Sequence, residues 1–146
     1  MLFTAMMDRI KIILVDNDPD ELYFMEKGFG AVSHYDIVAK FSDGSELMEF
    51  LYDARRLPDV IITDLNMPGK SGIEIAREIT LNPNFTFIKV IVLSLGFGNG
   101  PFELKRSGRS VSPIFVEKPS SLLAYREFAT DLHPKILADF IKGYPN

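Results

Sequence analysis

The chain has 146 residues, of which 47% are hydrophobic and 25% are charged, and this balance is typical of one globular domain with a packed core rather than of a disordered or fibrous protein. It contains no cysteine, which excludes a disulfide framework and a zinc site built from thiolates. The formal net charge is −4, and the 16 lysines and arginines are dispersed instead of forming a basic stripe, so we expect no binding to nucleic acid.

The N-terminal residues 1–9 do not resemble a targeting sequence, because they lack a basic start, a long apolar run and a cleavage site of small residues. We interpret them as a lead-in to a single domain over residues 10–146. No apolar stretch approaches the roughly 20 residues that are needed to span a bilayer. The sequence therefore predicts a cytoplasmic protein that does not associate with membranes.

Five short runs rich in β-branched residues recur along the chain. Several of them are apolar throughout, which is typical of strands that are buried on both faces, as in a parallel sheet. The predicted strands are Ile10–Val15, Tyr35–Phe41, Val60–Thr63, Val90–Leu93 and Ile114–Val116.

Segments with helical spacing of apolar residues lie between these runs. The predicted helices are Asp20–Phe29, Ser45–Ala54, Gly72–Leu81, a short or partly unwound Pro101–Ser107, and a closing helix from Ser121. The fourth is weak because residues 96–113 are rich in glycine and proline, and each interior glycine costs about 1 kcal/mol relative to alanine. We expect Pro134 to interrupt or restart the last helix.

Strands and helices thus alternate, which predicts a doubly wound α/β fold with a five-stranded parallel sheet and right-handed crossovers. In such sheets polar groups at the carboxyl ends of the strands converge in a crevice where the strand order reverses. The polar residues at those ends are Asp16, Asn17, Asp18, Asp64, Ser94, Glu117 and Lys118.

These residues suit the transfer of a phosphoryl group. A carboxylate such as that of Asp64 forms an acyl phosphate when a divalent cation and a fixed ammonium lie beside it. Mg²⁺ prefers oxygen ligands and commonly takes one or two carboxylates, so Asp16 and its neighbours are candidate ligands. Lys118 would pair with the carboxylate before transfer and with a phosphoryl oxygen afterwards, while the Ser94 hydroxyl would donate to another phosphoryl oxygen.

In order and spacing, the motifs resemble those of response-regulator receiver domains of two-component signalling. They are Leu14-Val15-Asp16-Asn17-Asp18-Pro19, Thr63-Asp64-Leu65-Asn66-Met67-Pro68-Gly69, Ser94 and Glu117-Lys118-Pro119. The resemblance implies a flavodoxin-like (βα)5 receiver fold of the stand-alone, chemotaxis-regulator-like kind.

By this resemblance Asp64 is the phosphoacceptor, Lys118 the lysine of the family pattern and Ser94 the hydroxyl residue of the switch. Phe115 corresponds to the aromatic residue that turns inward on activation, although a buried aromatic at a strand end is also ordinary core. The implied Mg²⁺ ligands are Asp16, Asn17, Asp64 and the carbonyl of Asn66.

The resemblance also implies the partners. The phosphoryl group would come from a sensor histidine kinase or a phosphotransfer protein of a phosphorelay, and a downstream protein target would read the change by contact. Transfer and autodephosphorylation would be self-catalysed with Mg²⁺, so the chain would not be an enzyme in the usual sense. The sequence ends at Asn146 without room for an output domain, and we expect a monomer or weak dimer.

Two residues depart from the family pattern. Asn17 stands where the family usually has a second acid, which predicts weaker Mg²⁺ binding, although a role for Asn17 in the turn alone fits equally well. Leu95 follows Ser94 where a small residue is common, and its bulk would slow transfer. These departures leave open a pseudo-receiver, a phosphorylation-independent interaction module. An aspartyl phosphatase is disfavoured, because Asn66 replaces the general acid two residues after the nucleophile.

Overall fold

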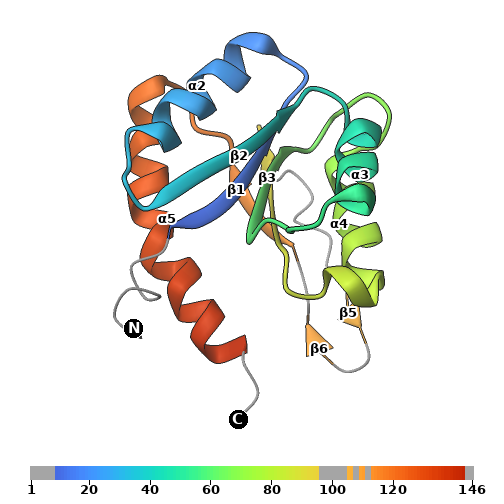
Figure 1. Ribbon diagram of the computed structural model, residues 1–146. Coiled ribbons are helices and arrows are strands. Elements are labelled where there is room, and N and C mark those ends of the chain that lie inside the picture. The colour runs from blue at the N-terminus through green and yellow to red at the C-terminus, as the bar shows by residue number, and fades with distance from the viewer. Residues whose placement is uncertain (1–8, 96–104, 107–108, 111–112, 144–146) are drawn as a thin grey trace.

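In the computed structural model, which describes residues 9–95, 105–106, 109–110 and 113–143, five strands form one sheet (Figure 1). They are β1 (Ile10–Val15), β2 (Tyr35–Phe41), β3 (Val60–Asp64), β4 (Lys89–Ser94) and β7 (Ile114–Glu117). The order across the sheet is β2-β1-β3-β4-β7, and every neighbouring pair is parallel. The predicted fold class and all five predicted strands are confirmed.

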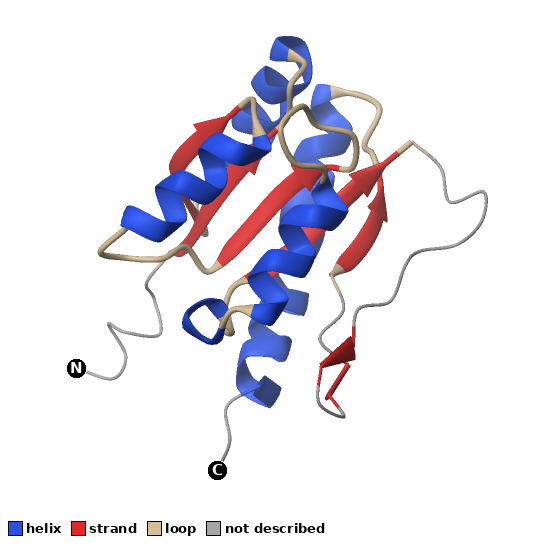
Figure 2. Cartoon of the chain, turned by 90° about the vertical axis from the view of Figure 1, so that its right-hand side faces the viewer, coloured by secondary structure: helices blue, strands red, loops and turns tan. Residues whose placement is uncertain are grey.

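The helices lie in two layers, one on each face of the sheet (Figure 1), and Figure 2 looks onto one face, with helices in front of the strands and behind them. They are α2 (Pro19–Gly30), α3 (Gly44–Asp53), α4 (Gly72–Leu81) and α5 (Leu122–Gly143), with a 3₁₀ turn η1 (Pro83–Phe85). Helices α2 and α5 cover one face, and α3 and α4 cover the other (Figure 1). In the described part of the chain, no helix is long and apolar enough to cross a membrane.

Strand β1 has apolar residues at nearly every position, without the alternation of apolar and polar residues that a half-exposed strand has. Ile12 and Leu14 belong to the core cluster under α2 and α5, whereas Ile13 and Val15 belong to the cluster under α3 and α4. Successive side chains of a strand point to opposite faces, and here both faces are covered. A central strand of this sheet therefore has no solvent-facing side.

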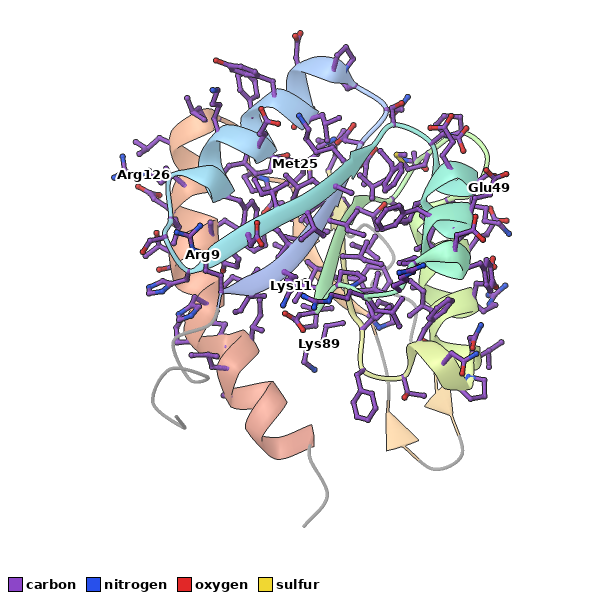
Figure 3. The ribbon with its side chains drawn as sticks, viewed as in Figure 1. Arg9, Lys11, Met25, Glu49, Lys89 and Arg126 are labelled. Carbon is purple, nitrogen blue, oxygen red and sulfur yellow. The ribbon has the colours of Figure 1, made fainter. Side chains whose placement is uncertain are left out.

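Side chains in Figure 3 follow the same division. Met25 of α2 is fully buried and points toward the sheet, whereas Glu49 of α3 and Arg126 of α5 lie on the outer surfaces of their helices (Figure 3). Lys11 and Lys89 lie near the amino ends of their strands, away from the carboxyl ends where the polar motifs gather (Figure 3).

Each helix after a strand end begins at a side-chain cap. The carboxylate of Asp18 accepts a hydrogen bond from the N–H of Asp20 at 2.9 Å, and that of Asp43 accepts one from Ser45 at 2.6 Å. Ser71 and Glu74 form a reciprocal capping box at the start of α4. Caps of this kind stabilise a helix by about 1 kcal/mol each, and they also fix the loops that carry the polar motifs.

The predicted fourth helix is wrong in the part that the structure describes. Lys105–Arg106 form a short strand, β5, which pairs antiparallel with β6 (Arg109–Ser110). The rest of Pro101–Ser107 lies outside the described residues. The two short runs on either side of Ser107-Gly108 satisfy backbone hydrogen-bonding groups by pairing with each other, in place of the hydrogen bonds of a helical turn.

The predicted interruption at Pro134 is also wrong, because α5 continues through it from Leu122 to Gly143. An interior proline costs a helix about 3 kcal/mol. Leu132 and Ile136 on either side of it are buried in the same core cluster, which favours one continuous helix. Packing against the sheet thus outweighs the local penalty.

Helices α2 and α5 approach each other closely at Gly28. A Cβ atom at Gly28 would lie 2.7 Å from Cβ of Tyr125 and 2.9 Å from its carbonyl carbon. Real Cβ atoms do not come so near, so the absence of a side chain at Gly28 allows Tyr125 its position.

We therefore expect Gly28→Ala to lower the free energy of unfolding by about 1–3 kcal/mol, because the clash at α5 outweighs the better helix propensity of alanine. Gly30→Ala in the same helix is the matched control, since its Cβ would meet only a side-chain atom of Ile37 at 4.0 Å. Urea denaturation of both variants measures the difference. Equal stability of the two variants would contradict the close-packing argument.

Candidate functional site

The polar site lies at the carboxyl ends of β1, β3, β4 and β7. Val15 is level with Thr63 in the register between β1 and β3, so Asp16 and Asp64 follow at corresponding positions of neighbouring strands. Ser94 ends β4, and its carbonyl accepts a hydrogen bond from the N–H of Lys118 at 2.7 Å. Parallel strands in register thus bring four distant segments to one edge of the sheet.

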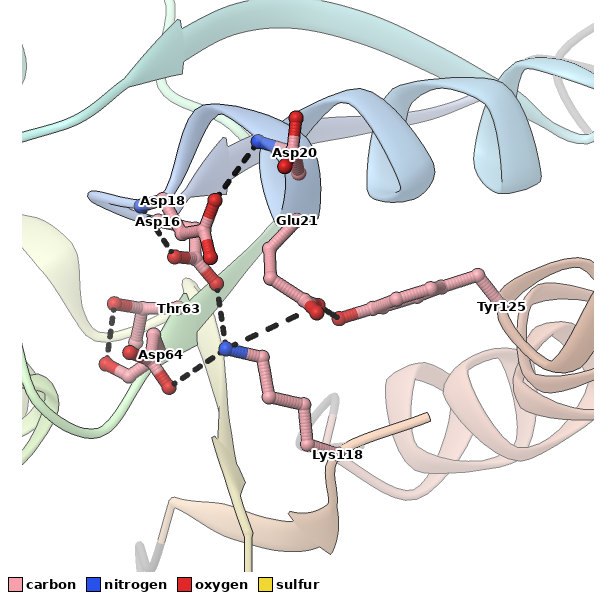
Figure 4. A network of polar contacts seen from close by, with 8 residues as sticks. All are labelled: Asp16, Asp18, Asp20, Glu21, Thr63, Asp64, Lys118 and Tyr125. Atoms are coloured by element: carbon pink, nitrogen blue, oxygen red, sulfur yellow. Dashed lines mark hydrogen bonds and ion pairs between the residues drawn. The ribbon is translucent and has the colours of Figure 1, made fainter. Parts of the chain in front are cut away.

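The ammonium of Lys118 lies between the carboxylates of Asp16 and Asp64 (Figure 4). Its Nζ atom is 2.9 Å from Asp16 Oδ2 and 3.3 Å from Asp64 Oδ1. The side chain of Asp16 is fully buried, that of Lys118 is 9% exposed and that of Asp64 is 14% exposed. The three charges are therefore largely shielded from water. At such burial each charge needs a partner of opposite sign.

The carboxylate of Asp16 is oriented by the backbone. Its Oδ1 atom accepts a hydrogen bond from the N–H of Asp18 at 2.9 Å. Its own N–H donates to the carbonyl of Phe41 at 3.1 Å. The Oδ2 atom is buried and accepts no hydrogen bond of good geometry from the described residues, so its close contact there is the ion pair with Lys118.

The electrostatics of Asp64 and Lys118 follow from this crowding. Burial raises the pKa of the Asp64 carboxyl, the charge of Asp16 raises it further, and Lys118 opposes both without cancelling them. Burial by itself lowers the pKa of Lys118, but the hydrogen bond and charges of its carboxylate neighbours raise it by more. The ammonium is therefore held in its charged form, while Asp64 is less acidic than an ordinary aspartate.

The loop after Asp64 is held against α3. The N–H of Gly44 donates to the carbonyl of Pro68 at 3.2 Å. Gly69 has φ +78°, and a Cβ there would lie 2.5 Å from a carboxylate oxygen of Asp43. Only glycine adopts that conformation without strain at so close an approach. The loop that carries Asn66 is thus fixed next to the phosphoacceptor candidate.

The predicted site residues differ in how closely they gather. The structure brings Asp16, Asp64 and Lys118 into contact and buries Ser94 at the neighbouring strand end. The side chains of Asn17 and Asn66 are exposed.

The two bulky residues beside the site take different positions. Phe115 is half-buried and packs against the α3 and α4 layer. The side chain of Leu95 is 85% exposed, so it packs against little of the described protein.

Two residues of the site were missed by sequence analysis. Oε2 of Glu21 lies 3.9 Å from Nζ of Lys118 and accepts a hydrogen bond from the hydroxyl of Tyr125 at 2.7 Å. Burial and the hydrogen bond to Glu21 both raise the pKa of Tyr125 above its ordinary value. An acid in a first helical turn is ordinary, and nothing in the sequence pairs residues 104 positions apart.

The residues present fit Mg²⁺ as far as the donor atoms are concerned. Asp16 and Asp64 supply two largely buried carboxylates that share one ammonium, and a cation would offset both the burial and the like charge that raise the pKa of Asp64. Among the described residues, however, no group of three or more histidine, cysteine, aspartate or glutamate side chains is arranged to hold a metal ion.

Comparison with known proteins shows which family the chain resembles over most of its length. Residues 12–119 match the family model for the response regulator receiver domain, and that range includes all the predicted site residues. The transcriptional regulatory protein RcsB of Salmonella typhi is 31% identical over 140 residues, which cover 94% of this chain and 58% of RcsB. A "Probable cyclic di-GMP phosphodiesterase" of Vibrio cholerae is 33% identical over 112 residues, which cover 76% of this chain and 24% of that protein.

A solved structure agrees with these matches. The isolated REC domain of RcsB from Salmonella enterica serovar Typhimurium, in the presence of the phosphomimetic BeF3−, is 25% identical. Its TM-score is 0.61, and the match covers 95% of this chain and 93% of that one. The chain spans about a quarter to three fifths of the length of the two curated relatives, 24% and 58%.

The raised pKa of Asp64 has a consequence for stability. An acid whose pKa is higher in the folded state costs stability when ionised, and this cost is relieved as the pH falls through the folded pKa. We therefore expect Asp64→Asn to be more stable than the parent protein at pH 7, with the difference shrinking toward pH 4. Thermal unfolding at several pH values measures this, with Asp36→Asn on exposed β2 as the control for loss of a charge. A less stable Asp64→Asn at pH 7 would show that the ion pair with Lys118 dominates.

Proposed function

Because the chain belongs to the response regulator receiver domain family, we propose that Asp64 accepts a phosphoryl group and that the resulting change is read by a partner protein. Receiver domains interact with kinases and with downstream targets. The observation that carries the proposal for this chain is the contact of Lys118 with the buried carboxylates of Asp16 and Asp64. An ammonium at 3.3 Å from the nucleophile is positioned to pair with a phosphoryl oxygen after transfer.

The proposed reaction is a phosphoryl transfer to a carboxylate. An oxygen of Asp64 attacks the phosphorus of a phosphohistidine, the bond from phosphorus to the imidazole nitrogen breaks, and an acyl phosphate forms on Asp64. The donor's imidazole keeps the electron pair and is free to take a proton. Lys118 neutralises charge on the phosphoryl oxygens, and the hydroxyl of Ser94 donates to another of them.

Asp16, Asp64, Asn17 and the carbonyl of Asn66 would hold Mg²⁺ in this proposal. Bound there, the ion would supply a positive charge that offsets the negative charge of the phosphoryl group and of the two carboxylates. The largely buried carboxylates of Asp16 and Asp64, which share one ammonium, support this assignment. Because Asn17 is uncharged and exposed, we propose that the binding is weaker than with a second acid at that position.

The wider setting is proposed from the family. A sensor histidine kinase or a phosphotransfer protein is the proposed donor, a downstream protein target is the proposed receiver of the signal, and the cytoplasm is the proposed location of this chain. RcsB is named a transcriptional regulator, and this chain matches 58% of its length. A stand-alone domain that signals by protein contact, as a monomer or weak dimer without binding nucleic acid, is our proposal for the residues of this chain.

One observation supports a second candidate function. The side chain of Asn17 is exposed, and no cluster of three potential metal-binding side chains is found in the described segments. A pseudo-receiver that keeps the fold and binds a partner without phosphorylation is consistent with that observation. The two candidates differ in whether Asp64 is modified.

Intact mass after incubation with acetyl phosphate separates them. We expect the parent protein to gain one phosphoryl group in the presence of Mg²⁺ and to gain none after Asp64→Asn. Asp59→Asn is the matched control, because Asp59 lies outside the site and its carboxylate binds the N–H of Lys11 at 2.9 Å. No gain of mass by the parent protein at high donor and metal concentration would favour the pseudo-receiver.

The place of Asn17 can be tested separately. We expect Asn17→Asp to tighten Mg²⁺ binding by about tenfold, because a second carboxylate beside a dication adds on the order of 1.4 kcal/mol of attraction. Isothermal titration with Mg²⁺ measures the change, and Asn66→Asp tests the other exposed asparagine. An unchanged affinity after Asn17→Asp would show that residue 17 does not face the metal.

A further inference from the structure

Lys118 faces three carboxylates, although the proposed phosphoryl transfer uses only two of them. The third belongs to Glu21 in the first turn of α2, with Oε2 at 3.9 Å from Nζ of Lys118. Figure 4 shows Glu21 and Asp64 on opposite sides of the ammonium. A lysine ammonium carries three N–H donors on a flexible stem, so neighbours on several sides are needed to fix its position.

Glu21 is itself restrained from α5. Its Oε2 atom, the same atom that faces Lys118, accepts the hydroxyl hydrogen of Tyr125 at 2.7 Å. Tyr125 is fully buried, and its ring stays in place because Gly28 of α2 leaves room for its backbone. A rigid, buried donor thus holds one oxygen of a carboxylate whose side chain is 27% exposed.

We propose that Glu21 is a positioning residue for Lys118 and that the hydroxyl of Tyr125 holds Glu21 in place, so that α5 is connected to the phosphorylation site through Glu21 and Lys118. Glu21 attracts the ammonium from the side opposite to Asp64 and limits its movement along the line between them. A displacement of the ammonium then changes the charge that the Tyr125 hydroxyl faces. The geometric part of this proposal is independent of phosphorylation, whereas its kinetic part rests on the proposed function.

The chain contains a second triad of the same chemistry that serves as an internal control. Nζ of Lys70 lies 2.8 Å from Oε1 of Glu78, and the hydroxyl of Tyr52 donates to Oε2 of Glu78 at 2.6 Å. This triad lies on α3, α4 and the loop before α4, and Tyr52 is 56% exposed. It tests whether a tyrosine signal responds to loss of a nearby lysine charge.

The geometric test uses ¹⁹F NMR of the full chain labelled with 3-fluorotyrosine. The Tyr125 and Tyr52 signals are assigned by their loss in Tyr125→Phe and Tyr52→Phe. We expect Lys118→Met to shift the Tyr125 signal and leave that of Tyr52 in place, and Lys70→Met to do the reverse. Lys118→Arg, which keeps the charge, should return the Tyr125 signal toward its parent position. A Tyr125 signal that is unchanged in Lys118→Met would overturn the proposal.

The kinetic test measures phosphorylation of Asp64 by acetyl phosphate. We expect Glu21→Gln and Tyr125→Phe each to lower the maximal rate by about tenfold, the size of one hydrogen bond to a charged group, without changing the donor concentration at half-maximal rate. The double variant should be no slower than the single ones, because both act through one carboxylate. Tyr23→Phe, at a 52% exposed tyrosine of α2, is the control.

The outcomes separate the two proposals. Unchanged rates in Glu21→Gln and Tyr125→Phe, or rate losses that add in the double variant, would overturn the positioning role of Glu21. If the parent protein is not phosphorylated at all, the proposed function fails, and the ¹⁹F shifts still decide whether Glu21 couples Lys118 to Tyr125.

Discussion

The ion pair of Lys118 with Asp16 and Asp64 is the constraint on which the carboxyl edge of the sheet depends. Its three charges come from the ends of β1, β3 and β7 and are largely withdrawn from water. The ammonium of Lys118 offsets two largely buried carboxylates, and removing it would leave them uncompensated, which costs about 3–5 kcal/mol. The three strand ends must therefore stay in register, and the hydrogen bond from Lys118 N–H to the Ser94 carbonyl helps to keep them there.

The same ion pair makes the site sensitive to a change of charge at Asp64. Burial raises the pKa of Asp64 and the charge of Asp16 raises it further, while Lys118 lowers it by less, so Asp64 is less acidic than an ordinary aspartate. Any group that adds charge at Asp64 changes the balance around one ammonium. Since that ammonium also faces Glu21, and Glu21 binds Tyr125 of α5, a local change in charge has a short physical route to the helix on that face of the sheet.

Two glycines allow the close contacts around the site, although neither contributes a side chain to it. Gly69 in its left-handed conformation lets the loop after Asp64 rest on the cap of α3. Gly28 lets α5 approach α2 closely enough for the Tyr125 hydroxyl to reach Glu21. At both positions a side chain would displace backbone or a restrained side chain, so the packing of the layers and the geometry of the site are linked.

The sequence by itself determined the five strands of the sheet, the helices other than the predicted Pro101–Ser107, and the residues at the strand ends. Apolar runs such as Val60–Thr63 and apolar residues at helical spacing act locally, so their pattern predicts strands and helices directly. The chemistry of Asp16, Asp64 and Lys118 followed from the topology of parallel sheets. Tertiary structure alone decided that α5 passes through Pro134, that Lys105–Arg106 is a strand, and that Glu21 meets Tyr125 beside Lys118. These features depend on packing and pairing between distant segments, whose free energy exceeds local propensity and leaves no periodic mark in the sequence.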